Sequence, residues 1–202
     1  MTVMHESLGL TADGVVALRG ERLVLRGLSL AVPPGGALVL MGANGSGKST
    51  ALRVLAGLKR PDAGGVAWQG RDAMLDPAAY ASHVAYLGHL DAVKPALTVA
   101  ENLWFAASAA GWAAALEGQD LWALRDLPAR LLSAGQRRRL ALARVVAAAR
   151  AVWLLDEPTL GLDAAAVGRL GTALATHREA GGVVVAATHV PLPLPDAAEL
   201  RL

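Results

Sequence analysis

The sequence predicts an α/β protein whose parallel sheet is interrupted by an all-helical block. Short apolar runs that suit buried strands alternate with helical segments over about residues 23–87 and 151–187. A glycine-rich loop at residues 42–49 joins one of these runs to a helix. From about residue 97 to residue 150 the chain is instead rich in alanine and leucine at helical spacings.

The elements follow from periodicity, turn residues and capping patterns. A Pro-Pro-Gly-Gly turn at residues 33–36 precedes a continuous apolar run that suits a buried parallel strand. Thr98 and Glu101 form the capping-box pattern T-x-x-E, which opens one helix, and Ser133 opens another. The expected strands are Leu23–Leu25, Leu28–Val32, Ala37–Met41, Val66–Trp68, Val84–Leu87, Ala151–Leu155 and Val183–Ala187, and the expected helices are Ser49–Leu58, Val99–Ala110, Ser133–Arg150 and Ala164–Ala180.

Composition excludes several classes of protein. The chain has 202 residues, of which 54% are hydrophobic and 18% charged, so intrinsic disorder is excluded. The absence of cysteine excludes disulfide scaffolds and thiolate chemistry. A net charge of +2 argues against a nucleic-acid partner. No apolar segment reaches the roughly 18 residues of a membrane span, and the first ten residues lack the cationic flank of a secretory signal. We therefore expect a cytosolic chain that meets a membrane only through a partner.

A phosphate-binding loop is the most specific motif. Residues 42–49 match G-x-x-x-x-G-K-[ST], and this chain's own composition gives such a match by chance with a probability of about 0.3%. The glycines let backbone N–H groups point at phosphate oxygens, and the helix N-terminus adds partial positive charge. Lys48 is expected to reach the β- and γ-phosphates, and the Ser49 hydroxyl to bind Mg²⁺. The predicted nucleotide-binding residues of this loop are Gly42, Ala43, Asn44, Gly45, Ser46, Gly47, Lys48, Ser49 and Thr50.

Two carboxylates directly follow the apolar run Val152–Leu155. They stand at the C-terminal end of the expected strand, the edge at which open α/β sheets bind ligands. Asp156 is predicted to hold Mg²⁺ and Glu157 to act as general base toward the attacking water. Alone, the pair would be read as an acidic turn that ends a strand; the phosphate loop favours the catalytic interpretation.

A second signature identifies the kind of nucleotide-hydrolysing protein. Leu132–Gln136 reads L-S-A-G-Q and precedes the arginine run Arg137–Arg139. Here the chain resembles the nucleotide-binding subunits of ATP-binding-cassette (ABC) transporters over nearly its whole length. Pro158–Asp163 resembles that family's D-loop, and His189 its switch histidine, the sensor of the γ-phosphate. For the arginine run we expect a solvated helix face, or contact with acidic partners or lipid headgroups.

The resemblance implies a P-loop ATPase fold with a mainly parallel sheet, N-terminal antiparallel strands and an inserted helical subdomain. It divides a single domain into a nucleotide-binding core, residues 1–88 and 151–202, and a helical subdomain, residues 89–150. It also implies ATP and Mg²⁺, and a homodimer in which the signature of one copy closes on the ATP of the other. The residues expected at that trans contact are Ser133, Ala134, Gly135 and Gln136, with Asp163 in the D-loop. Without the resemblance, Ser133 would be the cap of a surface helix.

Two positions depart from the family pattern. Where the family places an aromatic residue against adenine, the register here gives Arg19, which can stack on a π face. The family also has a glutamine after the strand that ends near Leu87, where it contacts Mg²⁺ and links to the membrane subunit. Here the chain has no glutamine at that place, and His89 is expected to stand in for it.

A narrower resemblance comes from the segments Tyr86–Asp91, Lys94–Val99 and Glu101–Leu103. They are similar to the ATP-binding subunits of the haem exporters of cytochrome c biogenesis. That likeness implies integral membrane partners and a peripheral location on the cytoplasmic face of the inner membrane. Trp104 and Trp112, in the helical block, are then candidates for docking to the partner, or else core residues. No residue pattern by itself indicates haem.

Other functions remain open. The chain could serve an ABC transporter for another substrate, or be a soluble ABC ATPase of the translation or DNA-repair kind. Against the soluble kinds stand the single phosphate loop and the length of 202 residues. A regulatory module that binds nucleotide without turnover is disfavoured by Glu157 and His189. A GTPase is disfavoured because no N-K-x-D guanine motif is present.

Overall fold

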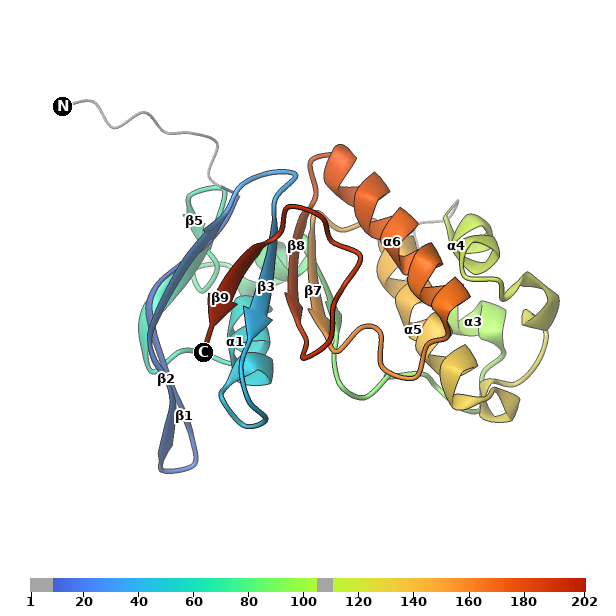
Figure 1. Ribbon diagram of the computed structural model, residues 1–202, viewed down its shortest axis with the longest axis horizontal. Helices are drawn as coiled ribbons and strands as arrows, with labels where there is room; N and C mark the ends of the chain where they lie inside the picture. Colours follow the sequence, from blue (N-terminus) through green and yellow to red (C-terminus); the bar gives the residue numbers. More distant parts are fainter. Residues whose placement is uncertain (1–8, 105–110) are drawn as a thin grey trace.

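The computed structural model describes residues 9–104 and 111–202. Within these ranges the chain forms two sheets and a group of helices (Figure 1). A parallel sheet has the strand order β6-β7-β8-β3-β9, and an antiparallel sheet has the order β2-β1-β4-β5. The strands are β1 Leu10–Arg19, β2 Arg22–Val32, β3 Ala37–Met41, β4 Ala63–Trp68, β5 Arg71–Asp72, β6 Val84–Leu87, β7 Val152–Asp156, β8 Val183–Ala187 and β9 Ala198–Arg201. The helices are α1 Lys48–Leu55, α2 Pro77–Ala81, α3 Val99–Trp104, α4 Trp112–Gly118, α5 Ala134–Ala147 and α6 Ala164–Glu179, with short 3₁₀ turns η1 Trp122–Leu124 and η2 Ala129–Leu131.

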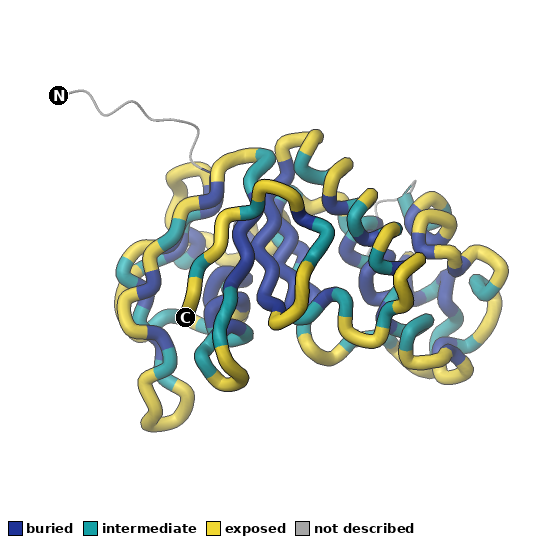
Figure 2. Tube along the Cα trace, viewed as in Figure 1, coloured by how far each residue is buried: buried dark blue, intermediate teal, exposed yellow. Residues whose placement is uncertain are grey.

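The parallel sheet is the middle layer of the molecule. Every residue of β7 and β8 is buried, as expected for a sheet covered on both faces (Figure 2). Leu154 of β7 packs in the cluster that contains α1 and the antiparallel strands, whereas Trp153 and Leu155 pack in the cluster that contains α5 and α6. Alternate residues of one strand therefore serve two cores, and the sheet is held between them (Figure 1).

The antiparallel strands include one that the sequence did not reveal. β1 buries Leu10, Ala12, Val15 and Ala17, but register shifts between Ala12 and Val15 and between Ala17 and Leu18 break its alternation. The two short runs expected at 23–25 and 28–32 are one continuous strand, β2, which includes Gly27. The mixed α/β fold class itself is confirmed, including the antiparallel N-terminal strands.

The helical block follows β6 and precedes β7 in the sequence, and it has its own core. Leu103, Leu116, Leu121 and Leu140 are fully buried there. The capping box that opens α3 is formed, since Thr98 N–H donates to Glu101 (2.7 Å) and Glu101 N–H donates to Thr98 Oγ1 (3.1 Å). The expected helix to Ala110 is described only as far as Trp104, because residues 105–110 lie outside the described ranges.

Other elements also differ from the expected ones; α1, for example, ends at Leu55 rather than at Leu58. The helix expected to reach Arg150 ends earlier, where Ala148 caps α5 and Ala149 takes a left-handed conformation (φ 48°). The last strand, β9, was not expected: it is a short edge strand with exposed polar residues. In the two described ranges, no helix is both long enough and apolar enough to cross a bilayer.

Candidate nucleotide-binding site

The glycine-rich loop leads from β3 into α1. Gly42, Gly45 and Gly47 have positive φ angles (147°, 83° and 111°), which side chains disfavour. A Cβ atom at Gly47 would lie 2.9 Å from the Val24 carbonyl oxygen, so this position also needs glycine for space. Lys48 is 7% exposed, and its Nζ donates to the Gly42 and Ala43 carbonyl oxygens (2.7 and 3.1 Å). The loop therefore curls around the lysine ammonium.

The order of the parallel strands brings distant residues to this loop. β8 lies between β7 and β3, and Ala187 at its end pairs with both Asp156 and Leu40. Asp156 at the end of β7, Glu157 directly after it, the histidine after β8 and the loop after β3 thus stand at one edge of the sheet. They line a single cavity of about 420 Å³. Val24 and Leu160, which were not predicted, line this cavity as well. The predicted residues that line it are Arg19, Asn44, Gly45, Gly47, Lys48, Ser49, Thr50, His89, Asp156, Glu157 and His189.

The two carboxylates differ in their surroundings. Asp156 is 2% exposed, and none of the described residues forms a hydrogen bond with its Oδ2 atom. Glu157 has a left-handed backbone (φ 47°), and its N–H donates to the Ala187 carbonyl oxygen (2.8 Å). One carboxylate oxygen of Glu157 lies 2.9 Å from Nδ1 of His189, whose side chain is 57% exposed. Asp156 is thus a buried carboxylate with a free oxygen, and Glu157 a carboxylate paired with imidazole.

The site has the donor atoms that Mg²⁺ prefers. Asp156, with its unpartnered carboxylate oxygen, and Ser49 both line this cavity, and carboxylate and hydroxyl oxygens are hard ligands. Among the described residues no group of three or more His, Asp or Glu side chains could hold a metal. Mg²⁺ commonly takes one or two protein ligands together with substrate phosphates and water. The residues present therefore fit Mg²⁺ bound with a phosphate substrate.

The signature segment lies outside this cavity. Ser133 caps α5: its Oγ accepts from the Gln136 N–H (3.2 Å), and its own N–H donates to the Gln136 side chain (2.8 Å). Ser133 and Ala134 are exposed. A Cβ atom at Gly135 would lie 3.0 Å from the Gly161 carbonyl oxygen, so the helix start packs closely against the segment before Asp163. Asp163 in turn caps α6 by accepting from the Ala166 N–H (2.7 Å). Neither Ser133–Gln136 nor Asp163 lines the phosphate cavity of its own copy.

Comparison with known proteins identifies the family. The profile of the family described as "ABC transporter" matches residues 25–160. The chain is 48% identical over 195 residues to the "Cytochrome c biogenesis ATP-binding export protein CcmA" of Rhodospirillum rubrum, covering 94% of this chain and 84% of the relative. The protein of the same name from Paramagnetospirillum magneticum is 50% identical over 201 residues, covering 95% of this chain and 93% of the relative. This chain belongs to the CcmA family of ABC transporter ATP-binding proteins.

Solved structures agree with the CcmA-family fold. A structure titled "Structure of ATP binding subunit of ABC transporter" has a TM-score of 0.83 at 24% identity, covering 90% of this chain and 79% of that one. A "bacterial Atm1-family ABC exporter with ATP bound" has a TM-score of 0.86 at 24% identity, covering 100% of this chain and 38% of that one. At this identity the likeness shows the fold alone.

Both departures from the family pattern lie at the CcmA-family site. Arg19, at the end of β1, and His89, two residues after β6, are exposed and line the same cavity as Lys48. The structure thus brings both residues to the cavity that Lys48 lines, one from before the phosphate loop in the sequence and the other from after it. Their roles toward adenine and Mg²⁺ stay predictions.

The arginine run after the signature corrects one expectation. Arg138 is 4% exposed rather than solvated. Its neighbours behave differently: Arg137 donates to the Leu132 carbonyl oxygen (2.6 Å), and Arg139 donates to residues 119 and 120 of the helical block. Helical spacing could have revealed this, because Arg138 stands four and seven residues before the buried Leu142 and Val145. Arg138 is thus a further residue near the site, besides Val24 and Leu160, that sequence reasoning missed.

Proposed function

We propose that this chain is the ATP-hydrolysing subunit of an exporter of cytochrome c biogenesis, the haem-export system, and that it works as a homodimer on membrane partners. One observation carries the ATPase part: the phosphate loop, both carboxylates and His189 line one cavity at the edge of the parallel sheet. The export part rests on relatives up to 50% identical that carry the name "Cytochrome c biogenesis ATP-binding export protein CcmA".

Nucleotide binding is proposed to use the loop and its flanking residues. Backbone N–H groups of residues 42–50 surround the phosphates, and the Lys48 ammonium provides a buried positive charge beside them. Ser49 and Asp156 would hold Mg²⁺, which when bound neutralises charge on the β- and γ-phosphates. Arg19 lines the same cavity, and its guanidinium would stack on the adenine. His89 also lines this cavity and would stand in for the family glutamine.

Hydrolysis is proposed to use Glu157 as general base. The water oxygen attacks the γ-phosphorus, and the bond from that phosphorus to the β,γ-bridging oxygen breaks, with its electron pair leaving on ADP. The water proton passes to the Glu157 carboxylate. His189, at 2.9 Å from this carboxylate, orients it and is placed to contact the γ-phosphate.

The dimer is proposed because the site lacks its second half in one copy. The exposed start of α5, with Ser133, Ala134, Gly135 and Gln136, is a helix N-terminus that favours anions but lies outside its own phosphate cavity. In a head-to-tail pair it would face the ATP of the other copy, with Asp163 beside the contact. The core at 1–88 and 151–202 would then bind nucleotide in cis, and the helical subdomain at 89–150 would present the signature in trans.

Membrane partners are proposed from the relatives' names and from one surface. Trp104 and Trp122 are 58% and 38% exposed, and both ring systems contact Trp112 (centroid distances 6.0 and 5.8 Å). Aromatic residues of this kind are enriched in protein interfaces. The chain would then lie peripherally on the cytoplasmic face of the inner membrane. With a net charge of +2, no nucleic-acid partner is proposed.

Affinity purification of the tagged chain from detergent-solubilised membranes tests this proposal. We expect integral membrane subunits to copurify, together with ATPase activity that is lost in Glu157→Gln. Deletion of the gene should remove covalently bound haem from c-type cytochromes on a haem-stained gel. Normal c-type cytochromes would instead favour an ABC transporter for another substrate. A chain recovered with no membrane protein would favour a soluble ABC ATPase.

A further inference from the structure

We propose that Arg138 is a positioning residue for ATP hydrolysis, an inference that rests on the proposed ATPase function. Its guanidinium divides its contacts between two places. Nη2 donates to the carbonyl oxygens of Asp156 and Glu157 (2.7 and 2.6 Å). Nη1 donates to the Gly88 carbonyl oxygen (3.1 Å) and to the Asp91 carboxylate (2.9 Å). One buried side chain thus ties α5 to the backbone of both carboxylates and to the segment that carries His89.

The first set of contacts fixes the conformation of Glu157. A non-glycine residue with φ of 47° is strained, and such a conformation persists only where the surroundings hold it. Here the Glu157 N–H donates to the Ala187 carbonyl oxygen, and the Glu157 carbonyl oxygen accepts from Arg138 Nη2 and from the Leu160 N–H (3.1 Å). With both backbone groups bonded, the side chain leaves the backbone in a defined direction, toward His189. Without Arg138, the Asp156 and Glu157 carbonyl oxygens would each lose a charged donor, and the Glu157 carbonyl oxygen would be held by the Leu160 N–H alone.

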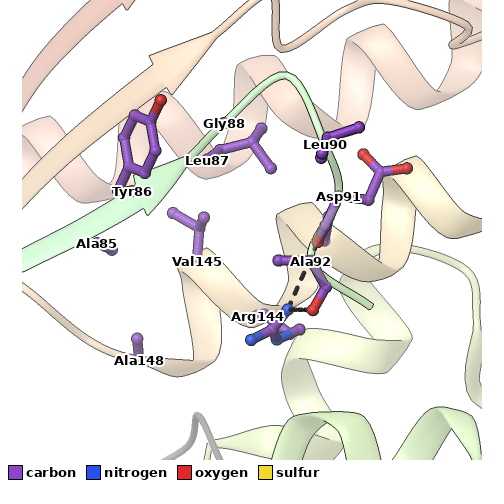
Figure 3. Close-up of a pocket in the computed structure, with 11 residues that line it drawn as sticks. Ala85, Tyr86, Leu87, Gly88, Leu90, Asp91, Ala92, Arg144, Val145 and Ala148 are labelled. Carbon is purple, nitrogen blue, oxygen red and sulfur yellow. Dashed lines mark hydrogen bonds between the residues drawn. The ribbon is translucent and has the colours of Figure 1, made fainter. Parts of the chain in front are cut away.

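The second set of contacts connects the carboxylates to residues 88–92. Arg144, also from α5, holds the same segment by donating to the carbonyl oxygens of Asp91 (3.5 Å) and Ala92 (2.5 Å), as Figure 3 shows. This segment borders a further cavity of about 230 Å³ that Tyr86 and Leu90 also line (Figure 3). The Asp91 carboxylate compensates the buried guanidinium charge. Movement of residues 88–92 is thereby coupled to the backbone position of Glu157 through one guanidinium.

The geometry requires arginine. A guanidinium is a planar fork that can donate in two directions at once, whereas an ammonium is a single point charge. Arg138→Lys could reach one of the two places, and Arg138→Gln has neither the charge nor the reach. We therefore expect kcat for ATP hydrolysis to be highest with arginine at position 138, lower with lysine and lowest with glutamine. Lysine should restore part of the activity because it keeps the positive charge.

The test is steady-state ATPase kinetics of the whole complex, with each variant carried by the full chain. In Arg138→Gln we expect kcat to fall about 10²-fold, the effect of misplacing a catalytic group by roughly 1 Å. KM for ATP should stay within about twofold, because Arg138 does not line the phosphate cavity. Arg139→Gln is the matched control. It removes the neighbouring arginine and its hydrogen bonds to Gln119 and Asp120. Because none of these bonds involves Asp156 or Glu157, kcat should be unchanged.

Two results would overturn the inference. One is wild-type kcat in Arg138→Gln; the other is a loss of kcat that Arg139→Gln shows equally, which would mark a general structural effect. If Arg138→Gln does not fold, Asp91→Asn answers the same question, because it keeps the guanidinium and removes its charged anchor. Asp91→Asn should lower kcat about tenfold and leave KM unchanged, as expected for a small displacement of a catalytic group. A wild-type kcat in Asp91→Asn would also overturn the inference. Glu157→Gln separates the two proposals. If Glu157→Gln lowers kcat and Arg138→Gln does not, the positioning role fails and the general-base assignment stands. If Glu157→Gln keeps wild-type activity, the general-base assignment fails, and the positioning role, which acts through Glu157, fails with it.

Discussion

Glu157 shows how one residue combines an unfavourable backbone with a useful side chain. Its left-handed conformation turns the carboxylate out of the sheet edge and toward His189, while Asp156, one residue earlier, stays buried in β7. The backbone thus directs two adjacent carboxylates to different surroundings. In the proposed mechanism, Asp156 would hold Mg²⁺ and Glu157 would accept the proton of the attacking water.

The general-base assignment predicts a specific defect in Glu157→Gln. We expect kcat for ATP hydrolysis to fall about 10²- to 10⁴-fold, because the amide cannot accept the water proton. ATP binding should persist, since Lys48 and the loop backbone are untouched. Retention of labelled ATP on the purified protein, measured beside turnover, shows both effects. Glu179→Gln, at the exposed end of α6, is the control and should behave as wild type. Normal turnover in Glu157→Gln would remove the residue from this role.

At this scale the sequence revealed contiguous motifs and missed contacts made through the fold. Lys48, Ser49, Asp156 and Glu157 could be predicted as site residues because each belongs to a short contiguous motif that can be read from its immediate neighbours in the sequence. Arg138 belongs to no such motif, and its partners at 88–91 and 156–157 are brought to it only when β6 and β7 pair and α5 packs across them. The strained φ of Glu157 likewise has no local signal, because it is held by bonds from α5 and β8.

Among the elements, α3 and α5 begin with the same device. Thr98 with Glu101, and Ser133 with Gln136, each form a reciprocal capping box. Only the second stands in the signature that we propose to contact ATP in trans. The pair therefore separates a capping role from a nucleotide role within one chain.

We expect Thr98→Ala and Ser133→Ala each to lower the free energy of unfolding by about 1 kcal/mol, the usual cost of losing an N-cap. Urea titration measures this. Only Ser133→Ala should also lower ATPase activity, because in the proposed dimer its hydroxyl and the adjoining N–H groups would face the nucleotide of the second copy. Equal ATPase activity in the two variants would leave Ser133 as a cap and no more.

The junction of α6 with β7 and β8 predicts a pH dependence of stability. The His177 ring stacks on the Trp153 ring (centroids 4.0 Å apart, planes at 9°). It also packs against Gly182, where any side chain would collide with the imidazole. Burial lowers the pKa of His177 below its ordinary value, although bonds from its ring to backbone act in the opposite direction. The unfolded chain then binds the proton more readily than the folded one. The contribution of His177 is thus complete above about pH 6.5, its unfolded pKa, and is lost as the pH falls through the lowered folded value.

Denaturant titrations between pH 7.5 and pH 5 check this expectation. The free energy of unfolding should decline with falling pH, and His177→Phe, which keeps a ring against Trp153 and cannot titrate, should show a shallower decline. An identical decline in wild type and variant would mean that other groups cause it.

Elements without a continuous pattern, such as β1 with its register shifts and the polar edge strand β9, were among those that sequence reasoning missed. Their pairing depends on neighbours rather than on their own periodicity.

At the scale of the whole molecule, the cis and trans halves of the proposed site can be tested in one mixing experiment. Lys48→Ala removes the cation beside the phosphates, and Ser133→Ala weakens the helix tip offered to the other copy. Each variant alone forms pairs in which both sites carry the same defect, so each should have low ATPase activity. When the two are mixed, a mixed pair has one site with both defects and one site with neither, because Lys48 from the Ser133→Ala chain meets Ser133 from the Lys48→Ala chain. ATPase activity of the mixture should therefore exceed that of either variant alone.

A control mixture of Lys48→Ala with Glu157→Gln places a defect in every site, since both residues act in cis, and should stay inactive. If the first mixture is no more active than its components, the two residues do not serve one ATP across two copies, and the head-to-tail arrangement is wrong.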